Sequence, residues 1–117
     1  MKKIISLLVV ILLLTACGES KYKTITTNEA LELIDNGAVV IDVRSAEEYN
    51  TGHIKGAINI PVDEISSITY DKNETLIIYC ASGVRSANAV NELADLGYTS
   101  LYNLDGGLLN WGSDLEE

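Results

Sequence analysis

The residues best suited to chemistry in this sequence are Cys80 and Arg85, which are separated by four residues. Cys80 follows the apolar run LIIY at 76–79, so we expect it at the end of a buried strand. A cysteine attacks as its thiolate, and a nearby positive charge such as that of Arg85 favours this form. The pair therefore predicts nucleophilic chemistry at sulfur; the alternative is that Cys80 is a small, buried apolar side chain.

The segment 80–86, called here the cysteine loop, has the features of an anion-binding turn. Gly83 permits a backbone conformation or a close approach that other residues resist, and we expect a helix to begin near Ser86. Inward-facing N–H groups and the positive end of that helix would attract negative charge. We predict that Cys80 is the catalytic nucleophile. The predicted substrate-binding residues are Ala81, Ser82, Gly83, Val84, Arg85 and Ser86.

Capping patterns and apolar runs predict the elements that must position this loop. The segments TTNE at 26–29 and SAEE at 45–48 have the spacing of capping boxes. They predict one helix that ends at Gly37 and another that ends at Asn50. We expect strands at 38–43, 57–60, 76–79 and 100–104, a helix at 86–96, and a short helix bearing Trp111.

The alternation of strands and helices along the chain predicts the fold class. The run AVVIDV at 38–43 is nearly all apolar and rich in β-branched residues, as in a strand buried on both faces. We therefore predict an α/β fold, with a small parallel β-sheet flanked by helices on both faces. Ligands of such sheets bind beyond the carboxyl ends of the strands, where Cys80 is expected.

The N-terminal segment has the pattern of an export signal. Two lysines precede the run 4–14, which is apolar apart from Ser6 and shorter than the roughly 20 residues that span a bilayer. Such a run suits a signal-peptide core. Leu14-Thr15-Ala16-Cys17 resembles the lipobox of bacterial lipoproteins; plain secretory cleavage is the alternative. We predict a signal peptide at 1–16, a tether at 17–23 lipidated on Cys17, and a folded domain at 24–117.

Charge and cysteine content narrow the expected partners. The chain has 8 basic and 17 acidic residues and a net charge of −9, so we expect no nucleic-acid partner. Membrane attachment would come from the lipid anchor of an exported protein, and we expect a monomer. With Cys17 acylated, Cys80 would be an unpaired, reactive thiol. One cysteine and one histidine cannot form a zinc site, so we expect no metal, and we expect no cofactor.

Four segments resemble the rhodanese-like sulfurtransferase family and occur in the order expected for it. They are Ile41-Asp42-Val43-Arg44 with Glu48 and Tyr49, the segment 52–61 (GHIKGAINIP), Cys80-x-x-Gly83-x-Arg85-Ser86, and Gly106-Gly107 with Trp111. The likeness covers about residues 24–112, which is nearly all of the expected domain.

The resemblance implies a sulfurtransferase that works through two covalent steps. Cys80 would take the outer sulfur of thiosulfate or a related donor as a persulfide. It would then pass that sulfur to cyanide, a small thiol or a protein cysteine. The family also implies a structural role for His53, and we expect Trp111 to be a packing residue. We expect Arg44 to pair with Glu48 and Arg85 to face the bound anion.

Two other functions remain open at this point. Phosphatases and arsenate reductases also place a cysteine and an arginine in a loop, but five residues separate the two in those enzymes. This chain has four, which suits a sulfane sulfur better than a tetrahedral oxyanion. The second alternative is a rhodanese-like module that binds without catalysis; the presence of Cys80 counts against it.

Overall fold

The computed structural model describes residues 21–117, whose elements alternate as the sequence predicts. The helices are α2 (Thr27–Asp35), α3 (Ala46–Thr51) and α4 (Val84–Asp95), with 3₁₀ turns η1 (Val62–Ser67) and η2 (Gly107–Asn110). The strands are β1 (Lys23–Ile25), β2 (Val39–Asp42), β3 (His53–Ile54), β4 (Ile58–Asn59), β5 (Leu76–Tyr79), β6 (Leu101–Leu104) and β7 (Leu115–Glu116).

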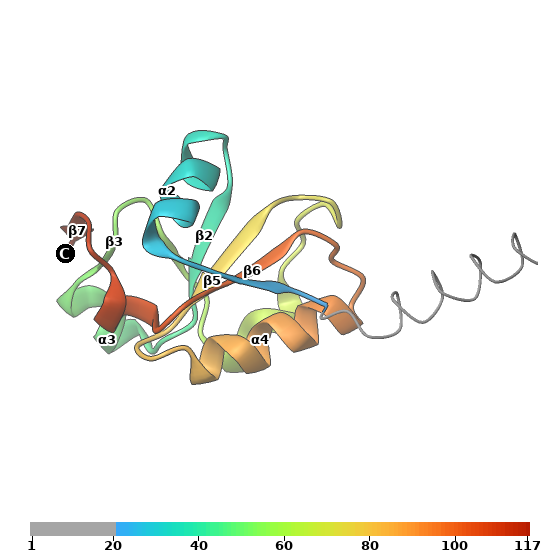
Figure 1. Ribbon diagram of the computed structural model, residues 1–117. Helices are drawn as coiled ribbons and strands as arrows, with labels where there is room; N and C mark the ends of the chain where they lie inside the picture. The colour runs from blue at the N-terminus through green and yellow to red at the C-terminus, as the bar shows by residue number, and fades with distance from the viewer. Residues whose placement is uncertain (1–20) are drawn as a thin grey trace, which may run out of the picture.

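A five-stranded sheet forms the centre of the domain, in the order β1-β6-β5-β2-β4. All of its pairings are parallel, which confirms the predicted sheet (Figure 1). The short strands β3 and β7 form a separate antiparallel pair. β5 occupies the middle of the parallel sheet, so its carboxyl end, which leads to Cys80, has strands on both sides.

Successive residues of β5 face opposite sides of the sheet and enter two different cores. Leu76 and Ile78 pack in a cluster with the α4 residues Val90 and Leu93. Ile77 and Tyr79 belong to the other cluster, which includes residues of α2. All four side chains of β5 are buried, because helices cover both faces. Figure 1 shows α2 on one side of the sheet and α4 on the other, as predicted.

Both predicted capping boxes are present. The Thr26 side chain accepts a hydrogen bond from the backbone N–H of Glu29, whose carboxylate accepts one from the backbone N–H of Thr26. Ser45 and Glu48 make the same reciprocal pair at the start of α3. The second box holds the Glu48 carboxylate near the start of a short helix, and this position matters at the site.

Several boundaries differ from the sequence predictions. α4 begins at Val84 and not at Ser86, because Gly83 takes the cap position, and the N–H of Ser86 in the first turn donates to Cys80. The strand predicted at 57–60 covers only Ile58–Asn59, and β3 precedes it. β1 includes Lys23, the last residue of the predicted tether; a three-residue strand with one buried side chain carries little signal in the sequence.

The N-terminal predictions lie outside the described residues. These are the signal peptide at 1–16 and lipidation of Cys17. Within residues 21–117, no helix is both long enough and apolar enough to cross a membrane.

Candidate active site

Cys80 lies directly after β5, and its sulfur is surrounded by hydrogen-bond donors. The backbone N–H of Gly83 donates to Sγ at 3.0 Å, and that of Ser86 donates at 3.4 Å. The Ser86 hydroxyl oxygen is also 3.4 Å from Sγ. Cys80 is only 1% exposed. The cysteine loop therefore curls around the sulfur and directs backbone N–H groups at it.

This arrangement favours the thiolate form of Cys80. Burial on its own raises the pKa of the thiol, because a charged sulfur loses its hydration. Hydrogen bonds from the Ser86 hydroxyl and from the backbone N–H groups of Ser86, Gly83 and Ser82 outweigh that effect. The net result is a Cys80 pKa below the ordinary value, as expected for a nucleophilic cysteine.

Replacing Ser86 with alanine is expected to raise the Cys80 pKa, because the thiolate loses a hydroxyl donor while the thiol loses little. The shift should be about one pH unit, since a hydrogen bond to a charged group contributes about 1.5 kcal/mol or more. The pH at which Cys80 is half-alkylated by iodoacetamide in a fixed time measures this shift. Reactivity should fall near pH 7 and recover at higher pH; an unchanged profile would contradict the role of Ser86.

Two features of the backbone keep the N–H groups pointed inward. Gly83 has φ of +105°, a conformation that side chains resist, and its carbonyl accepts the first hydrogen bond of α4 from Ala87. The first turn of a helix has N–H groups without partners in the helix, and here the N–H of Ser86 points at the sulfur. The negative charge of a thiolate is favourable at this end of the helix.

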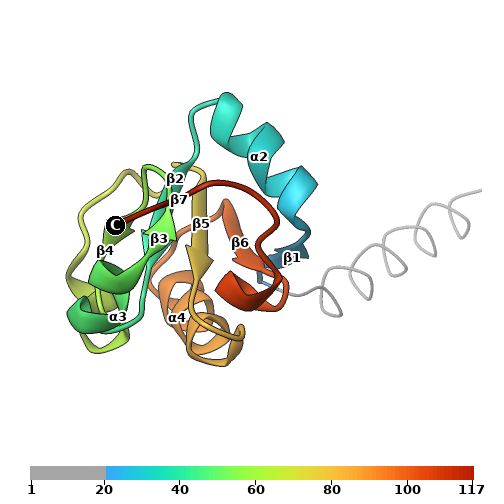
Figure 2. The ribbon, with the colours of Figure 1, turned by 90° about the vertical axis from the view of Figure 1, so that its left-hand side faces the viewer.

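The 3₁₀ turn η2 holds the other side of the cysteine loop. The backbone N–H of Leu108 donates to the carbonyl of Cys80 at 2.8 Å, and that of Leu109 donates to the carbonyl of Ala81 at 3.1 Å. Gly107 lies so close to these carbonyls that a Cβ atom there would be 2.4 Å from the Cys80 oxygen. Figure 2 shows η2 beside the turn that leads from β5 to α4.

The predicted substrate-binding residues divide into an outer and an inner set. Ser82 and Val84 are exposed, while Ala81, Gly83 and Arg85 are half-buried. Ser86 is fully buried and contacts the sulfur itself. The structure thus places all six residues around Cys80, with Ser82 and Val84 on the solvent side.

Arg85 belongs to the first turn of α4, and its guanidinium group contacts α3. Nη1 and Nη2 of Arg85 donate to the two carboxylate oxygens of Glu48 at 2.8 and 3.0 Å. These hydrogen bonds, with those of the Ser45 cap, lower the pKa of Glu48 to about 2. Glu48 therefore remains ionised at neutral pH, and the ion pair is present there.

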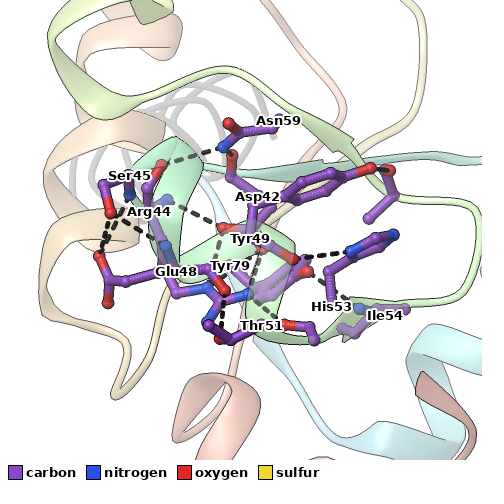
Figure 3. Close-up of polar contacts among 12 residues, drawn as sticks. Asp42, Arg44, Ser45, Glu48, Tyr49, Thr51, His53, Ile54, Asn59 and Tyr79 are labelled. Carbon is purple, nitrogen blue, oxygen red and sulfur yellow. Dashed lines mark hydrogen bonds and ion pairs between the residues drawn. The ribbon is translucent and has the colours of Figure 1, made fainter. Parts of the chain in front are cut away.

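The predicted pairing of Arg44 with Glu48 is wrong. Arg44 turns inward and donates to the Asp42 carboxylate, with an Nη2–Oδ2 distance of 2.7 Å, and to the carbonyl of Gly52 at 2.7 Å (Figure 3). Asp42 and Arg44 are 0% and 5% exposed. A buried carboxylate needs a partner of opposite charge, and Arg44 provides it two residues away. Glu48 is then free to bind Arg85.

The Asp42–Arg44 pair holds the segment after β2 in place. Asn59 donates from its amide to the backbone carbonyls of both residues, at 3.0 and 2.9 Å. Arg44 also joins this segment to Gly52 at the end of α3 (Figure 3). These contacts fix the position of α3 and hence that of Glu48. The pair therefore supports the segment that follows β2.

His53 and Trp111 make contacts within the fold. Nδ1 of His53 is 2.9 Å from the carbonyl oxygen of Tyr49, and the two rings stack with centroids 3.7 Å apart (Figure 3). Trp111 packs against the core on the α2 side. Within residues 21–117, His53 has polar contacts with Tyr49 and Glu116 and not with Cys80. These contacts fit the structural role that the family implies for His53 and the packing expected of Trp111.

Sequence reasoning missed three contributors to the site. Glu48 was recognised as a capping residue but was assigned to the wrong arginine. Gly107 belongs to one of the four family-like segments, and its close approach to Cys80 has no sequence signal. Asn103 donates weakly from β6 to the carbonyl of Gly83 at 3.5 Å, and nothing in the sequence marks it. Residues 21–117 contain no group of metal-ligating side chains that could hold an ion.

Comparison with known proteins agrees with this geometry. Residues 26–114 match the family model of the rhodanese-like domain, which covers most of the chain. The chain therefore belongs to the rhodanese-like domain family.

Individual relatives include named enzymes. The chain is 37% identical over 94 residues to the thiosulfate sulfurtransferase GlpE of Ectopseudomonas mendocina, covering 79% of this chain and 86% of that protein. It is 43% identical over 70 residues to the thiosulfate sulfurtransferase PspE of Escherichia coli, covering 56% and 67%. A crystal structure of a rhodanese-like domain protein from Staphylococcus aureus superposes with a TM-score of 0.71 at 38% identity, covering 80% and 96%.

Proposed function

We propose that this protein is a sulfurtransferase that carries sulfane sulfur as a persulfide on Cys80. The observation that carries the proposal is the set of N–H and hydroxyl donors around Sγ. Those donors stabilise a negative charge at the sulfur. Relatives named thiosulfate sulfurtransferases support the same class of reaction.

The first step loads the cysteine. The Cys80 thiolate attacks the outer sulfur of a donor such as thiosulfate, and a new sulfur–sulfur bond forms. The sulfur–sulfur bond of the donor breaks, and sulfite leaves with the electron pair. The negative charge of the thiolate passes to the outer sulfur of the persulfide. Donors in the cysteine loop, including the N–H of Gly83 at 3.0 Å, stabilise the charge near Sγ throughout.

The second step returns Cys80 to its thiolate form. Cyanide, a small thiolate or the thiolate of a protein cysteine attacks the outer persulfide sulfur, and the bond to Sγ breaks. The Cys80 thiolate is a good leaving group because its pKa is lowered. Sγ itself is buried, so the acceptor reaches the outer sulfur from the exposed side of the loop, near Ser82 and Val84.

Intact-protein mass spectrometry after treatment with thiosulfate tests this function. We expect the mass of one added sulfur atom, located on Cys80 by peptide analysis, and loss of that mass when cyanide is added. Release of thiocyanate should accompany the loss. A folded protein that gains no sulfur from thiosulfate or a thiosulfonate would contradict the proposal and favour a binding module without catalysis.

We also propose that the protein is exported and anchored to a membrane by a lipid on Cys17. The run Leu14-Thr15-Ala16-Cys17 after an apolar core supports this location. Replacing Cys17 with serine should abolish incorporation of labelled fatty acid, because serine lacks the thiol that the lipid modifies. The protein should also leave the membrane fraction or remain unprocessed. A serine variant that still incorporates fatty acid and sediments with membranes would contradict the anchor.

A further inference from the structure

The Glu48 carboxylate is hydrogen-bonded to the guanidinium of Arg85, the cationic group that we expect to bind a donor anion. Arg85 is the only cationic residue in the segment 80–86, and two of its N–H groups donate to Glu48. Both side chains are about two-fifths exposed, so the ion pair lies at the surface beside the loop. The guanidinium and the carboxylate together have a net charge near zero.

The Glu48–Arg85 ion pair lies next to the groups that contact the reacting sulfur. Arg85 directly precedes Ser86, whose backbone N–H and hydroxyl contact Sγ of Cys80. Negative charge on Cys80 also contributes to raising the pKa of Arg85, after the larger contribution of the Glu48 hydrogen bonds. The other nearby arginine, Arg44, is buried and paired with Asp42. Changing the charge of the Glu48–Arg85 pair therefore changes the electrostatic potential that a donor anion meets at the cysteine loop.

We propose that Glu48 is a specificity-determining residue, which neutralises Arg85 and so makes the site select sulfane donors with one negative charge over donors with two. Hydropersulfides and organic thiosulfonates belong to the first class, and thiosulfate belongs to the second. This inference rests on the proposed sulfurtransferase function. It also assigns Glu48 a role through Arg85, as a positioning residue that does not itself touch the reacting atoms.

Two sulfur donors of similar shape but different charge distinguish the effect of donor charge from the effect of donor size. Thiosulfate is a dianion, while methanethiosulfonate replaces one charged oxygen with a methyl group and is a monoanion. Both give the same Cys80 persulfide; the first releases sulfite and the second releases methanesulfinate, each with the electron pair of the broken bond. A unit charge within a Debye length of the sulfur should change the preference between them about tenfold at low salt.

The experiment compares kcat/KM for the two donors, with cyanide as the acceptor, in the wild type and three variants. Glu48→Gln retains an oxygen for the cap of α3 but leaves Arg85 with an unpaired positive charge. Arg85→Gln leaves the Glu48 carboxylate unpaired. Glu47→Gln is the matched control, because it removes the same charge from an exposed neighbour on α3, whereas Arg85 bonds to Glu48.

We expect the ratio of kcat/KM for thiosulfate to that for methanethiosulfonate to rise about tenfold in Glu48→Gln and to fall about tenfold in Arg85→Gln. Glu47→Gln should stay within about twofold of the wild type, because its charge is exposed and screened. The change in Glu48→Gln should shrink as salt is added. A purely structural role for Glu48 would change both donors equally and would not depend on salt.

Each remaining outcome overturns the inference. If both donors load Cys80 but the ratio is the same in the wild type, Glu48→Gln and Arg85→Gln, the ion pair does not select donors, although the sulfurtransferase function stands. An equal rise in Glu48→Gln and Glu47→Gln would assign the effect to overall charge. If neither donor loads Cys80 in the wild type, the proposed function fails together with this inference.

Discussion

Replacing Cys80 with serine is expected to reduce sulfur transfer to the uncatalysed background while the domain remains folded. The hydroxyl of serine is not ionised near neutral pH, and it cannot form a persulfide. The loop donors that lower the pKa of Cys80 have no thiolate to stabilise in this variant. Serine is nearly the same size and can accept the hydrogen bond from Gly83, so the cost in stability should be about 1 kcal/mol.

Thiocyanate release from thiosulfate and cyanide measures the activity, and thermal unfolding measures the stability. Cys80→Ala is the control for packing, because it removes both the sulfur and the acceptor for the Gly83 N–H group. Both variants should be inactive, and alanine should be the less stable of the two because the buried N–H groups lose their acceptor. Turnover above background in the folded serine variant would show that the sulfur is not carried on Cys80.

Replacing Gly107 with alanine is expected to disrupt both the fold and the cysteine loop. The added Cβ would lie 2.4 Å from the Cys80 oxygen and 2.7 Å from two backbone atoms of Ala81, so the backbone must move. The residue also has φ of +60°, where a side chain costs about 1–2 kcal/mol. Overpacking against backbone atoms adds about 1–3 kcal/mol.

Activity should fall further in Gly107→Ala than the loss of stability explains. Movement of η2 would release the hydrogen bonds that hold the Cys80 and Ala81 carbonyls and would turn the loop N–H groups away from the sulfur. We therefore expect the Cys80 pKa to rise toward that of a free thiol. Thiocyanate release measures the activity, and thermal unfolding measures the stability. The pH dependence of Cys80 alkylation, below the unfolding temperature, measures the change in pKa.

Gly56→Ala is the matched control for backbone conformation. Gly56 also has a positive φ, +83°, but a Cβ atom there would meet nothing within 4 Å. This variant should lose only the stability that the conformation costs, and the alkylation profile of Cys80 should not change. If Gly107→Ala behaves like Gly56→Ala, the close packing of η2 against the loop does not control the site.

Local sequence patterns were enough to predict the main elements and the position of the nucleophile. The hydrogen bonds of a capping box join residues only three positions apart. The residues that follow Thr26 and Ser45 are therefore enough to predict that a helix begins at each. The four apolar residues 76–79 must be buried on both faces, and a parallel sheet is the structure that allows it. The residue after that strand, Cys80, then lies at the edge where ligands of such sheets bind.

Element boundaries were less predictable, because contacts outside the segment decide them. β1 has only one buried side chain, and its backbone forms a strand because β6 provides a partner. The start of α4 at Val84 depends on the turn at Gly83, where the backbone bends around a sulfur atom. Neither cause lies in the apolar pattern of the segment itself.

The sequence by itself thus determined the α/β fold, the capping boxes and the placement of Cys80 at a strand end, because these depend on neighbours within a few residues. The tertiary structure decided which charges pair. Arg44 lies within four residues of both Asp42 and Glu48 along the chain, and in the fold it pairs with Asp42, whose buried carboxylate needs a partner of opposite charge. Glu48 then met Arg85, 37 residues away, and Gly107 met Cys80, because the folded sheet brings α3, α4 and η2 together around one strand end.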